Sequence, residues 1–243
     1  MGVADLLAVT ATLDAPRIFE RSVKLSQGRL SDDRGLVSMG RRALYPAPRT
    51  TLAELCAALG CNDCTALLPH LAAAHAVHFG ADDGIGKCYL EFAPDTAPAP
   101  DLVFLALKWA GTDKRLNRYT SVTHQSHDAK AALVAGLVPA GPVRDAMLAC
   151  LDLARDGDPD RTAVVLHVTE TGSPRASVDI SVADARLTLA DAAGLIAPVF
   201  AGFGLDPAPF LDAHGAARFG HIAAGMDSTG AAFATLYFGA RQL

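Results

Sequence analysis

The 243-residue sequence lacks features that would place it among membrane or secreted proteins. No apolar run reaches the roughly 18 residues that a bilayer-spanning helix requires. The short apolar stretch near the N-terminus follows the acidic Asp5 and has no basic leader, so it does not resemble a secretory signal. We therefore expect a cytoplasmic location and no membrane span.

An excess of positive charge is also missing. The chain carries 21 Lys and Arg residues against 26 Asp and Glu, which gives a formal net charge of −5. Nucleic acids and anionic membranes are usually bound by broad basic surfaces. We therefore expect neither as a partner, and any anion site must be local and enclosed.

Cysteines are few and lack the spacing of a disulfide framework. The five lie at Cys56, Cys61, Cys64, Cys88 and Cys150. One CxxC motif joins Cys61 to Cys64, but no second pair follows, so structural zinc would need two ligands from elsewhere. Histidine groups (His75 with His78; His124 and His127 with Asp128) are alternative metal ligands, although a turn histidine is more often a cap or surface residue. We expect no metal site.

Familiar catalytic motifs are absent, and one near-match fails. The sequence contains no GxSxG, HExxH or Rossmann glycine fingerprint. The stretch GADDGIGKC approaches a P-loop, which requires G-x4-GK, a hydroxyl residue and then a helix. Here Gly80 is one residue too far from Gly86, Cys88 replaces the hydroxyl, and CYLEF alternates as a strand. The stretch instead predicts a β-hairpin that turns at residues 82–85.

Pairing outward from this turn separates polar from apolar side chains. Gly80 then lies opposite Lys87, and His78 lies opposite Tyr89. One face of the hairpin carries His78, Lys87, Tyr89 and Glu91, and the other carries Val77, Phe79, Cys88, Leu90 and Phe92.

Three later segments predict further hairpins with one polar face each. Residues 103–123, paired outward from Gly111 and Lys114, put Lys108, Asn117 and Tyr119 on the polar face and Arg118 on the apolar face. Residues 164–180 put His167, Thr169, Arg175, Ser177 and Asp179 opposite Val164, Leu166, Val168, Ala176, Val178 and Ile180. The C-terminal hairpin turns at residues 227–230 and carries Tyr237 and Arg241 on the side of Thr235.

Helical patterns separate these hairpins. Residues 51–75 predict two short helices broken at residues 60–63, with Thr50 or Thr51 as N-cap. Two helices are expected in 127–156, with Pro142 in a first turn, and two more in 188–214, starting near Thr188 or Asp191. The first 50 residues fit either a hairpin containing Arg21, Lys24, Arg41 and Arg42 or a helix followed by a loop, and the hairpin is favoured.

Antiparallel hairpins that alternate with helix pairs predict an α+β fold in a single domain, residues 1–243. Helices would cover one face of a large antiparallel sheet, and the other face would carry the polar side chains. Because that face is costly to bury dry, the sheet either leaves it open to solvent or closes into a barrel of about ten strands with a polar interior. Closure would also remove the edge strands.

This order of elements, with KCY at 87–89 and RY at 118–119, resembles the ABBA-type (PT-barrel) aromatic or peptide prenyltransferases. The resemblance covers most of the chain, but a Pro-rich connector at 92–102 replaces a helix pair, and the chain is shorter than typical members. It implies a small, divergent transferase with ten strands around a polar chamber. Its activity would be prenyl transfer from an allylic diphosphate to an aromatic or peptide acceptor.

The resemblance also implies roles for individual residues. Carried over by position, Lys87, Lys108 and Arg175 would bind the diphosphate, while Tyr89, Tyr119 and Tyr237 would shield the allyl cation. Glu91 would act as the acceptor's base, and His78 would contact substrate. Fixed cations suit a leaving group's charge, and aromatic faces stabilise a carbocation. The acidic pairs at 32–33 and 82–83 do not form a DDxxD array, so no cofactor is expected and Mg²⁺ is allowed but not required.

An alternative is a non-catalytic protein, or an unrelated enzyme, that holds a small molecule or a peptide on a related scaffold. The short chain and the missing helix pair favour it. Lys87, Tyr89 and Glu91 would then be an ordinary solvated strand face. Lys108 fits this alternative less well, because it follows LVFLAL on a strand that is typical of a sheet centre.

Overall fold

Strands dominate the computed structural model, which describes residues 1–154 and 163–243. Its strands are β1 (Ile18–Ser26), β2 (Arg29–Ser31), β3 (Arg34–Gly40), β4 (Ala74–Asp82), β5 (Ile85–Phe92), β6 (Leu102–Ala110), β7 (Asp113–Ser121), β8 (Val165–Glu170), β9 (Ala176–Ser181), β10 (Phe219–Met226) and β11 (Ala232–Gln242). Its α-helices are α1 (Val3–Thr10), α2 (Pro48–Ala58), α3 (His127–Leu137), α4 (Pro142–Leu153), α5 (Ala193–Gly202) and α6 (Ala208–His214). Short 3₁₀ helices are η1 (Arg41–Leu44) and η2 (Ala183–Ala185).

Hydrogen bonds join the strands in the order β11-β10-β9-β8-β7-β6-β5-β4-β3-β1-β2, and β11 also pairs with β1. The three-residue β2 is attached to β1 outside this ring. The other ten strands therefore close an antiparallel β-barrel, which confirms the predicted α+β barrel fold. Among the described residues, no helix is long and apolar enough to cross a membrane.

The chain forms two compact units, each built from segments that are distant in the sequence. Unit 1 comprises Met1–Arg21, Asp32–Thr120 and Arg241–Leu243, and unit 2 comprises Ser22–Ser31 and Ser121–Ala240. The single-domain boundary of 1–243 stays a prediction.

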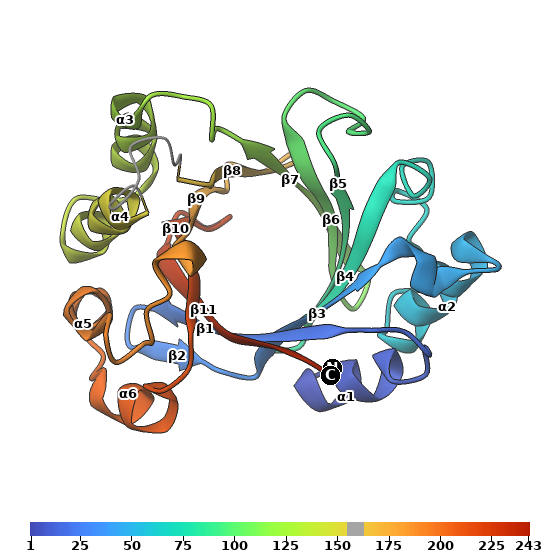
Figure 1. The fold of residues 1–243 in the computed structure, drawn as a ribbon, viewed down its shortest axis with the longest axis horizontal. Helices are drawn as coiled ribbons and strands as arrows, with labels where there is room; N and C mark the ends of the chain where they lie inside the picture. The colour runs from blue at the N-terminus through green and yellow to red at the C-terminus, as the bar shows by residue number, and fades with distance from the viewer. Residues whose placement is uncertain (155–162) are drawn as a thin grey trace. The chain divides into compact units, whose positions relative to one another are not determined.

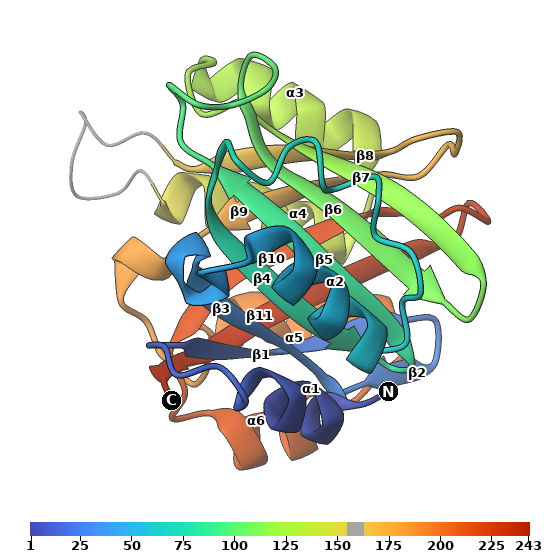
Figure 2. The ribbon, with the colours of Figure 1, turned by 90° about the vertical axis from the view of Figure 1, so that its right-hand side faces the viewer.

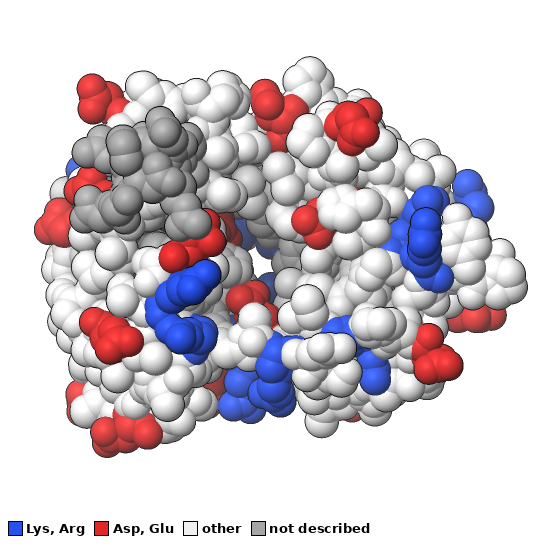
Figure 3. All heavy atoms as spheres, in the orientation of Figure 1, with Lys and Arg blue, Asp and Glu red and all other residues white. Residues whose placement is uncertain are grey.

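On the face drawn in Figure 3, acidic and basic side chains of the described residues are interspersed rather than gathered by sign.

Unit 1 is a curved sheet with helices on one face. Figures 1 and 2 show α2 lying across β4 and β5, and α1 beside β3. The strands send alternate side chains toward these helices, where Phe79 and Leu90 are fully buried with Leu6 and Leu52. The indole N–H of Trp109 donates to the carbonyl of Leu59, at 3.0 Å, and ties β6 to the segment after α2.

The opposite face of this sheet carries no helix of unit 1, and we call it the helix-free face. The predicted β4–β5 register is confirmed, since Gly80 pairs with Lys87 and His78 with Tyr89. The β6–β7 register is corrected by two residues, because Ala110 pairs with Asp113. A shift of two residues preserves the faces of a strand, so Lys108, Asn117 and Tyr119 still share one side.

Two further predictions in unit 1 need correction. Helix α2 begins at Pro48, with Ala47 rather than Thr50 or Thr51 as N-cap. The second helix expected before residue 75 is absent; successive turns take its place, as in the bond from the Leu67 N–H to the Cys64 carbonyl. Pro69 lies within that segment and has no N–H to donate, which disfavours a regular helix.

The first 50 residues contain the favoured hairpin. Strands β1 and β3 pair antiparallel, from Ile18 opposite Ser38 to Arg21 opposite Gly35. Arg21 and Lys24 lie in β1 as expected, but Arg41 and Arg42 lie in η1, beyond the strands. The helix-then-loop alternative is therefore wrong, although helix α1 precedes the strands.

Unit 2 contains β8 to β11 with α3 to α6 along one side of them (Figure 1). The two predicted helix pairs are confirmed, and Pro142 lies in the first turn of α4. Helix α5 starts later than expected, since Thr188 and Asp191 bond to each other through their side chains at 2.7 Å before the helix begins. Residues 155 and 156 of the predicted second helix lie outside the described residues.

The predicted faces of β8 are wrong. Leu166 pairs with Asp179, and His167 pairs with Val178, so the two strands place residues of opposite parity on the same side. Leu166 and Val168 therefore share the side of Asp179, while His167 and Thr169 share the side of Val178 and Ala176. A one-residue difference in register moves every side chain of a strand to the other face, and alternation within each strand cannot reveal it.

We expect Gly86→Ala to lower the free energy of unfolding by about 1–3 kcal/mol, the usual cost of overpacking a core. Gly86 lies directly opposite Trp109, and an added Cβ would overlap the indole ring. Urea denaturation measures the change. Gly40→Ala is the control, because its added Cβ meets no heavy atom within 4 Å; equal losses in the two variants would contradict the prediction.

Candidate active site

Four aromatic rings form a row across the helix-free face, one from each of four neighbouring strands: His78 of β4, Tyr89 of β5, Phe104 of β6 and Tyr119 of β7. His78 lies opposite Tyr89, and Phe104 lies opposite Tyr119. Ring centroids are 5.5 Å apart for His78–Phe104, 5.7 Å for Tyr89–Tyr119 and 5.8 Å for Phe104–Tyr119. These separations are typical of favourable edge-to-face packing. We call this set the aromatic row.

Cations cross the same face nearer the hairpin turns. Lys87 lies directly opposite Lys108, and Lys108 lies directly opposite Arg115. Like charges in directly opposed positions destabilise a sheet. The Asp82 carboxylate offsets part of this repulsion, since it lies 2.6 Å from the Lys87 Nζ and also pairs with Arg34. We call Arg34, Lys87, Lys108 and Arg115 the cation row.

Burial distinguishes the β3–β5 part of this face from a solvated strand surface, whereas the Arg115 side chain of β7 is 47% exposed. Lys87 and His78 are each only 8% exposed, and Arg34 is 3% exposed. Ionised side chains are rarely buried unless they are paired. The alternative of an ordinary wet face for Lys87, Tyr89 and Glu91 therefore does not fit Lys87.

A hydrogen-bonded chain of three side chains lies beside the aromatic row. The Ser38 Oγ lies 2.6 Å from the His78 Nδ1, and the His78 Nε2 lies 2.7 Å from the Glu91 Oε2. The other carboxylate oxygen of Glu91 lies 3.6 Å from the His75 Nε2. Burial by itself would raise the pKa of Glu91, but the hydrogen bond and charge of His78, together with His75, outweigh it and lower the pKa. Glu91 is therefore an ionised acceptor at neutral pH.

Two predicted residues, Arg175 and Tyr237, lie in unit 2. The Arg175 guanidinium lies 5.3 Å from the Phe233 ring centroid, and the Lys24 Nζ lies 5.2 Å from the same ring. One guanidinium nitrogen of Arg175, Nη1, is buried with no hydrogen-bond partner among the described residues.

Tyr237 belongs to a second cluster of unit 2. Its ring stacks on His221 with a centroid separation of 3.8 Å and an interplanar angle of 6°. The His221 Nδ1 lies 2.8 Å from an Asp179 carboxylate oxygen. The roles predicted for Arg175 and Tyr237 stay predictions.

Several residues of this face were not anticipated. Arg115 and Phe104 could have been found by counting the strand register from Lys108 and Tyr119. Ser38 and Arg34 could not, because they reach the face through the pairing of β3 with β4, which joins segments about 40 residues apart. As expected, Arg118 lies on the other face, opposite Leu105, so the RY motif contributes only its tyrosine.

The metal-ligand alternatives find little geometric support. Cys61 and Cys64 are buried free thiols, and a hydrogen bond to Cys56 and burial raise the pKa of Cys64, which disfavours a reactive thiolate. His127 lies 3.1 Å from Asp152. In residues 1–154 and 163–243, no three His, Cys, Asp or Glu side chains are grouped as metal ligands.

A cavity of about 230 Å³ lies in unit 2, between the α3–α4 loop and the ends of β1, α5 and β10. Its lining is largely apolar and includes Val138, Pro142, Phe203 and Phe233. Phe233, which Arg175 and Lys24 approach, is one of its lining residues.

Comparison with protein-family models and with curated proteins gives no match. Solved structures do match. 5-Dimethylallyltryptophan synthase from Streptomyces coelicolor superposes with a TM-score of 0.62 over 90% of this chain and 80% of that one, at 15% identity. NotF prenyltransferase gives a TM-score of 0.57 over the same shares, at 15% identity. Its complex with brevianamide F and DMSPP gives 0.52 at 13% identity, over 90% of this chain and 79% of that one.

The chain has the ABBA prenyltransferase fold. At these identities the likeness concerns the fold alone, because one fold can support several reactions.

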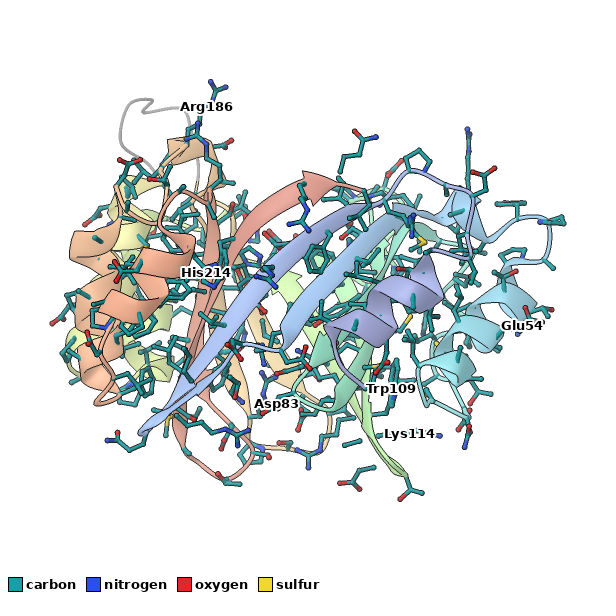
Figure 4. All side chains as sticks on the ribbon, turned by 90° about the horizontal axis from the view of Figure 1, so that it is seen from below. Glu54, Asp83, Trp109, Lys114, Arg186 and His214 are labelled. Atoms are coloured by element: carbon teal, nitrogen blue, oxygen red, sulfur yellow. The ribbon has the colours of Figure 1, made fainter. Side chains whose placement is uncertain are left out.

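We expect the chain to lose stability as the pH falls below about 4.5, partly through Glu91. Its folded-state pKa is lowered, so its stabilisation is present above the unfolded pKa and is lost as pH falls through the folded one. Glu91→Gln should therefore reduce the drop in melting temperature between about pH 6 and about pH 3.5. Glu54→Gln is the control, because Glu54 projects from α2 away from this face (Figure 4); an equal effect of both would contradict the prediction.

Proposed function

We propose that this chain is a transferase that moves a prenyl group from an allylic diphosphate to an aromatic or peptide acceptor. The observation that carries the proposal is the position of the cation row beside the aromatic row on one face of unit 1. NotF, which shares the fold, is described in complex with brevianamide F and DMSPP. The two rows supply one group of side chains for each end of an allylic diphosphate.

The cation row suits the diphosphate. When the bond between C1 of the prenyl group and the diphosphate oxygen breaks, its electron pair leaves with the diphosphate, and negative charge grows there. Lys87, Lys108 and Arg115 are held in directly opposed positions by the sheet, so their charges need little reorganisation. An anion among them would also relieve their mutual repulsion.

The aromatic row suits the allyl cation. Tyr89 follows Lys87 by two residues on β5, which corresponds to about 7 Å along a strand. A group bound to a diphosphate at Lys87 would therefore reach the rings of Tyr89 and Tyr119. Aromatic faces stabilise a cation, and rings packed edge to face also exclude water that would capture it.

Glu91 suits the acceptor. As an anion it accepts a hydrogen bond from a ring N–H or O–H, which raises electron density on the acceptor ring. A ring carbon then forms the new bond to C1, and the departing diphosphate takes the proton that this ring carbon loses. No step of this scheme requires a metal ion, although Mg²⁺ could bind the diphosphate as a counterion.

Unit 2 contributes further candidates. Arg175 stays proposed as a diphosphate ligand, and Tyr237 stays proposed as a shield for the cation. A cytoplasmic location likewise stays a proposal. Thermal stabilisation by allylic diphosphates and mass spectrometry of prenylated products, measured on Arg175→Ala and Tyr237→Phe, test the two residue roles.

Thermal stabilisation by dimethylallyl or geranyl diphosphate is the direct test. A ligand at about 100 times its Kd adds about 2.7 kcal/mol, which raises the melting temperature of a chain this size by about 5–10 °C. Lys108→Ala should abolish most of this shift. Lys114→Ala is the matched control, since Lys114 lies on the same hairpin but pairs with Asp63 at 3.1 Å on the other face (Figure 4).

Mass spectrometry of acceptors incubated with dimethylallyl diphosphate then tests turnover. The proposal expects one added prenyl group on an indole or phenol acceptor. Melting curves indifferent to both allylic diphosphates would overturn it. Binding without any prenylated product would favour the alternative of a non-catalytic binding protein.

A further inference from the structure

The hydrogen-bonded chain Ser38–His78–Glu91 joins three adjacent strands, β3, β4 and β5. Ser38 lies directly opposite His78, whereas Glu91 lies opposite Ala76, so the imidazole reaches Glu91 diagonally. Both bonds are short, 2.6 Å and 2.7 Å, and each uses a different ring nitrogen of His78. The His78 Nε2–H donates to the Glu91 carboxylate, and the Nδ1 shares a hydrogen bond with the Ser38 hydroxyl. Both ring nitrogens of His78 therefore have a partner within the chain.

Packing holds the imidazole in this orientation. The rings of Phe104 and Tyr89 approach it edge to face, at interplanar angles of 75° and 80°. The His78 side chain is 10% exposed, while that of Glu91 is 27% exposed. The histidine is thus enclosed, and the carboxylate is the member of the chain that a ligand can reach.

The hydrogen bond between His78 and Glu91 also affects the charge of Glu91. Burial favours the neutral acid, which donates a hydrogen bond, whereas the proposed reaction needs the anion, which accepts one. His78 tips this balance toward the anion. Without His78, burial beside the three remaining rings would favour the protonated form of Glu91, which cannot accept a hydrogen bond from the acceptor.

We propose that His78 is a positioning residue for the transfer, which holds Glu91 ionised and directed at the acceptor while Ser38 fixes the orientation of the imidazole. This inference rests on the proposed function and deepens it, because the resemblance assigned His78 to substrate contact alone. The proton lost from the acceptor ring passes to the departing diphosphate and not to His78.

Other charged or titratable groups share this face and belong in any pH analysis. They are Glu20 of β1, Arg34 of β3, His75 and Asp82 of β4, Lys87 and Tyr89 of β5, Lys108 of β6, and Asp113, Arg115 and Tyr119 of β7. Of these, His75 approaches Glu91 within 3.6 Å and also lowers its pKa. His75→Gln therefore belongs in the variant set, to separate its contribution from that of His78.

The first arm of the test is kinetic. His78→Phe keeps an aromatic ring but removes both hydrogen bonds, and His78→Gln restores an N–H donor toward Glu91. His78→Phe should lower kcat about 10- to 100-fold, less than the roughly 10²–10⁴-fold that a proton-transferring group contributes, because His78 acts through Glu91; KM for the allylic diphosphate should stay within about 2-fold of wild type. The acid limb of its pH profile of kcat should move to higher pH, because burial then raises the pKa of Glu91 without the opposing effect of His78. His78→Gln should recover most of kcat and return the limb toward wild type.

The second arm needs no activity. Glu20, Glu54, Glu91 and Glu170 are the chain's four glutamates, so ¹³C-labelled glutamate gives a simple spectrum in which Glu91→Gln identifies the Glu91 carboxyl signal. The pKa of Glu91 should rise in His78→Phe and rise less in Ser38→Ala. Ser38→Ala removes one hydroxyl and serves if the phenylalanine variant does not fold.

The outcomes are separable. If the pKa of Glu91 is the same in His78→Phe and Ser38→Ala as in wild type, the positioning role is overturned. The role is also overturned if His78→Gln loses as much kcat as His78→Phe and the acid limb of the pH profile of kcat does not shift. If neither allylic diphosphate stabilises the wild-type chain, the proposed function fails, and the Glu91 titration still decides whether His78 controls the carboxylate.

Discussion

The alternation of side chains along paired antiparallel strands is the constraint on which the candidate site depends. In β4 and β5, one set of alternate residues, including Phe79 and Leu90, packs under α1 and α2. The other set must then face away from those helices, and it contains His78, Lys87 and Glu91. Because the apolar set is fully buried, a slip of one residue would expose the core, so the hydrophobic face holds the polar face in register.

Register across strands turns this alternation into two chemically distinct rows. Lys87 lies opposite Lys108 in the pairing of β5 with β6, and Phe104 lies opposite Tyr119 in the pairing of β6 with β7. A row of directly opposed cations costs stability, and carboxylates offset part of this cost: Asp82 pairs with Lys87 and Arg34, and Asp113 lies 3.9 Å from Arg115. Retaining such a row is consistent with an anionic ligand, since stability by itself would favour neutral or alternating charges there.

The aromatic row and the Ser38–His78–Glu91 chain share one histidine. His78 packs its edges against Phe104 and Tyr89 and uses both ring nitrogens for hydrogen bonds. Packing and polarity are therefore coupled at this residue: a change in the aromatic row would also disturb the carboxylate. Such coupling limits which substitutions at His78 are informative, and it is the reason for comparing a ring-retaining variant with an amide variant.

Local patterns in the sequence determined the hairpins, their turns and most faces, because alternation and turn residues act over a few positions. The β4–β5 register followed from the DDGI turn, and the face of Lys108 survived a two-residue error in its own hairpin. The faces of β8 did not follow, because each strand alternates by itself and only the pairing with β9 relates the two. Only the tertiary structure brought Ser38 and Arg34 to the site, since long-range strand pairing depends on the whole buried sheet and leaves no local sequence signal.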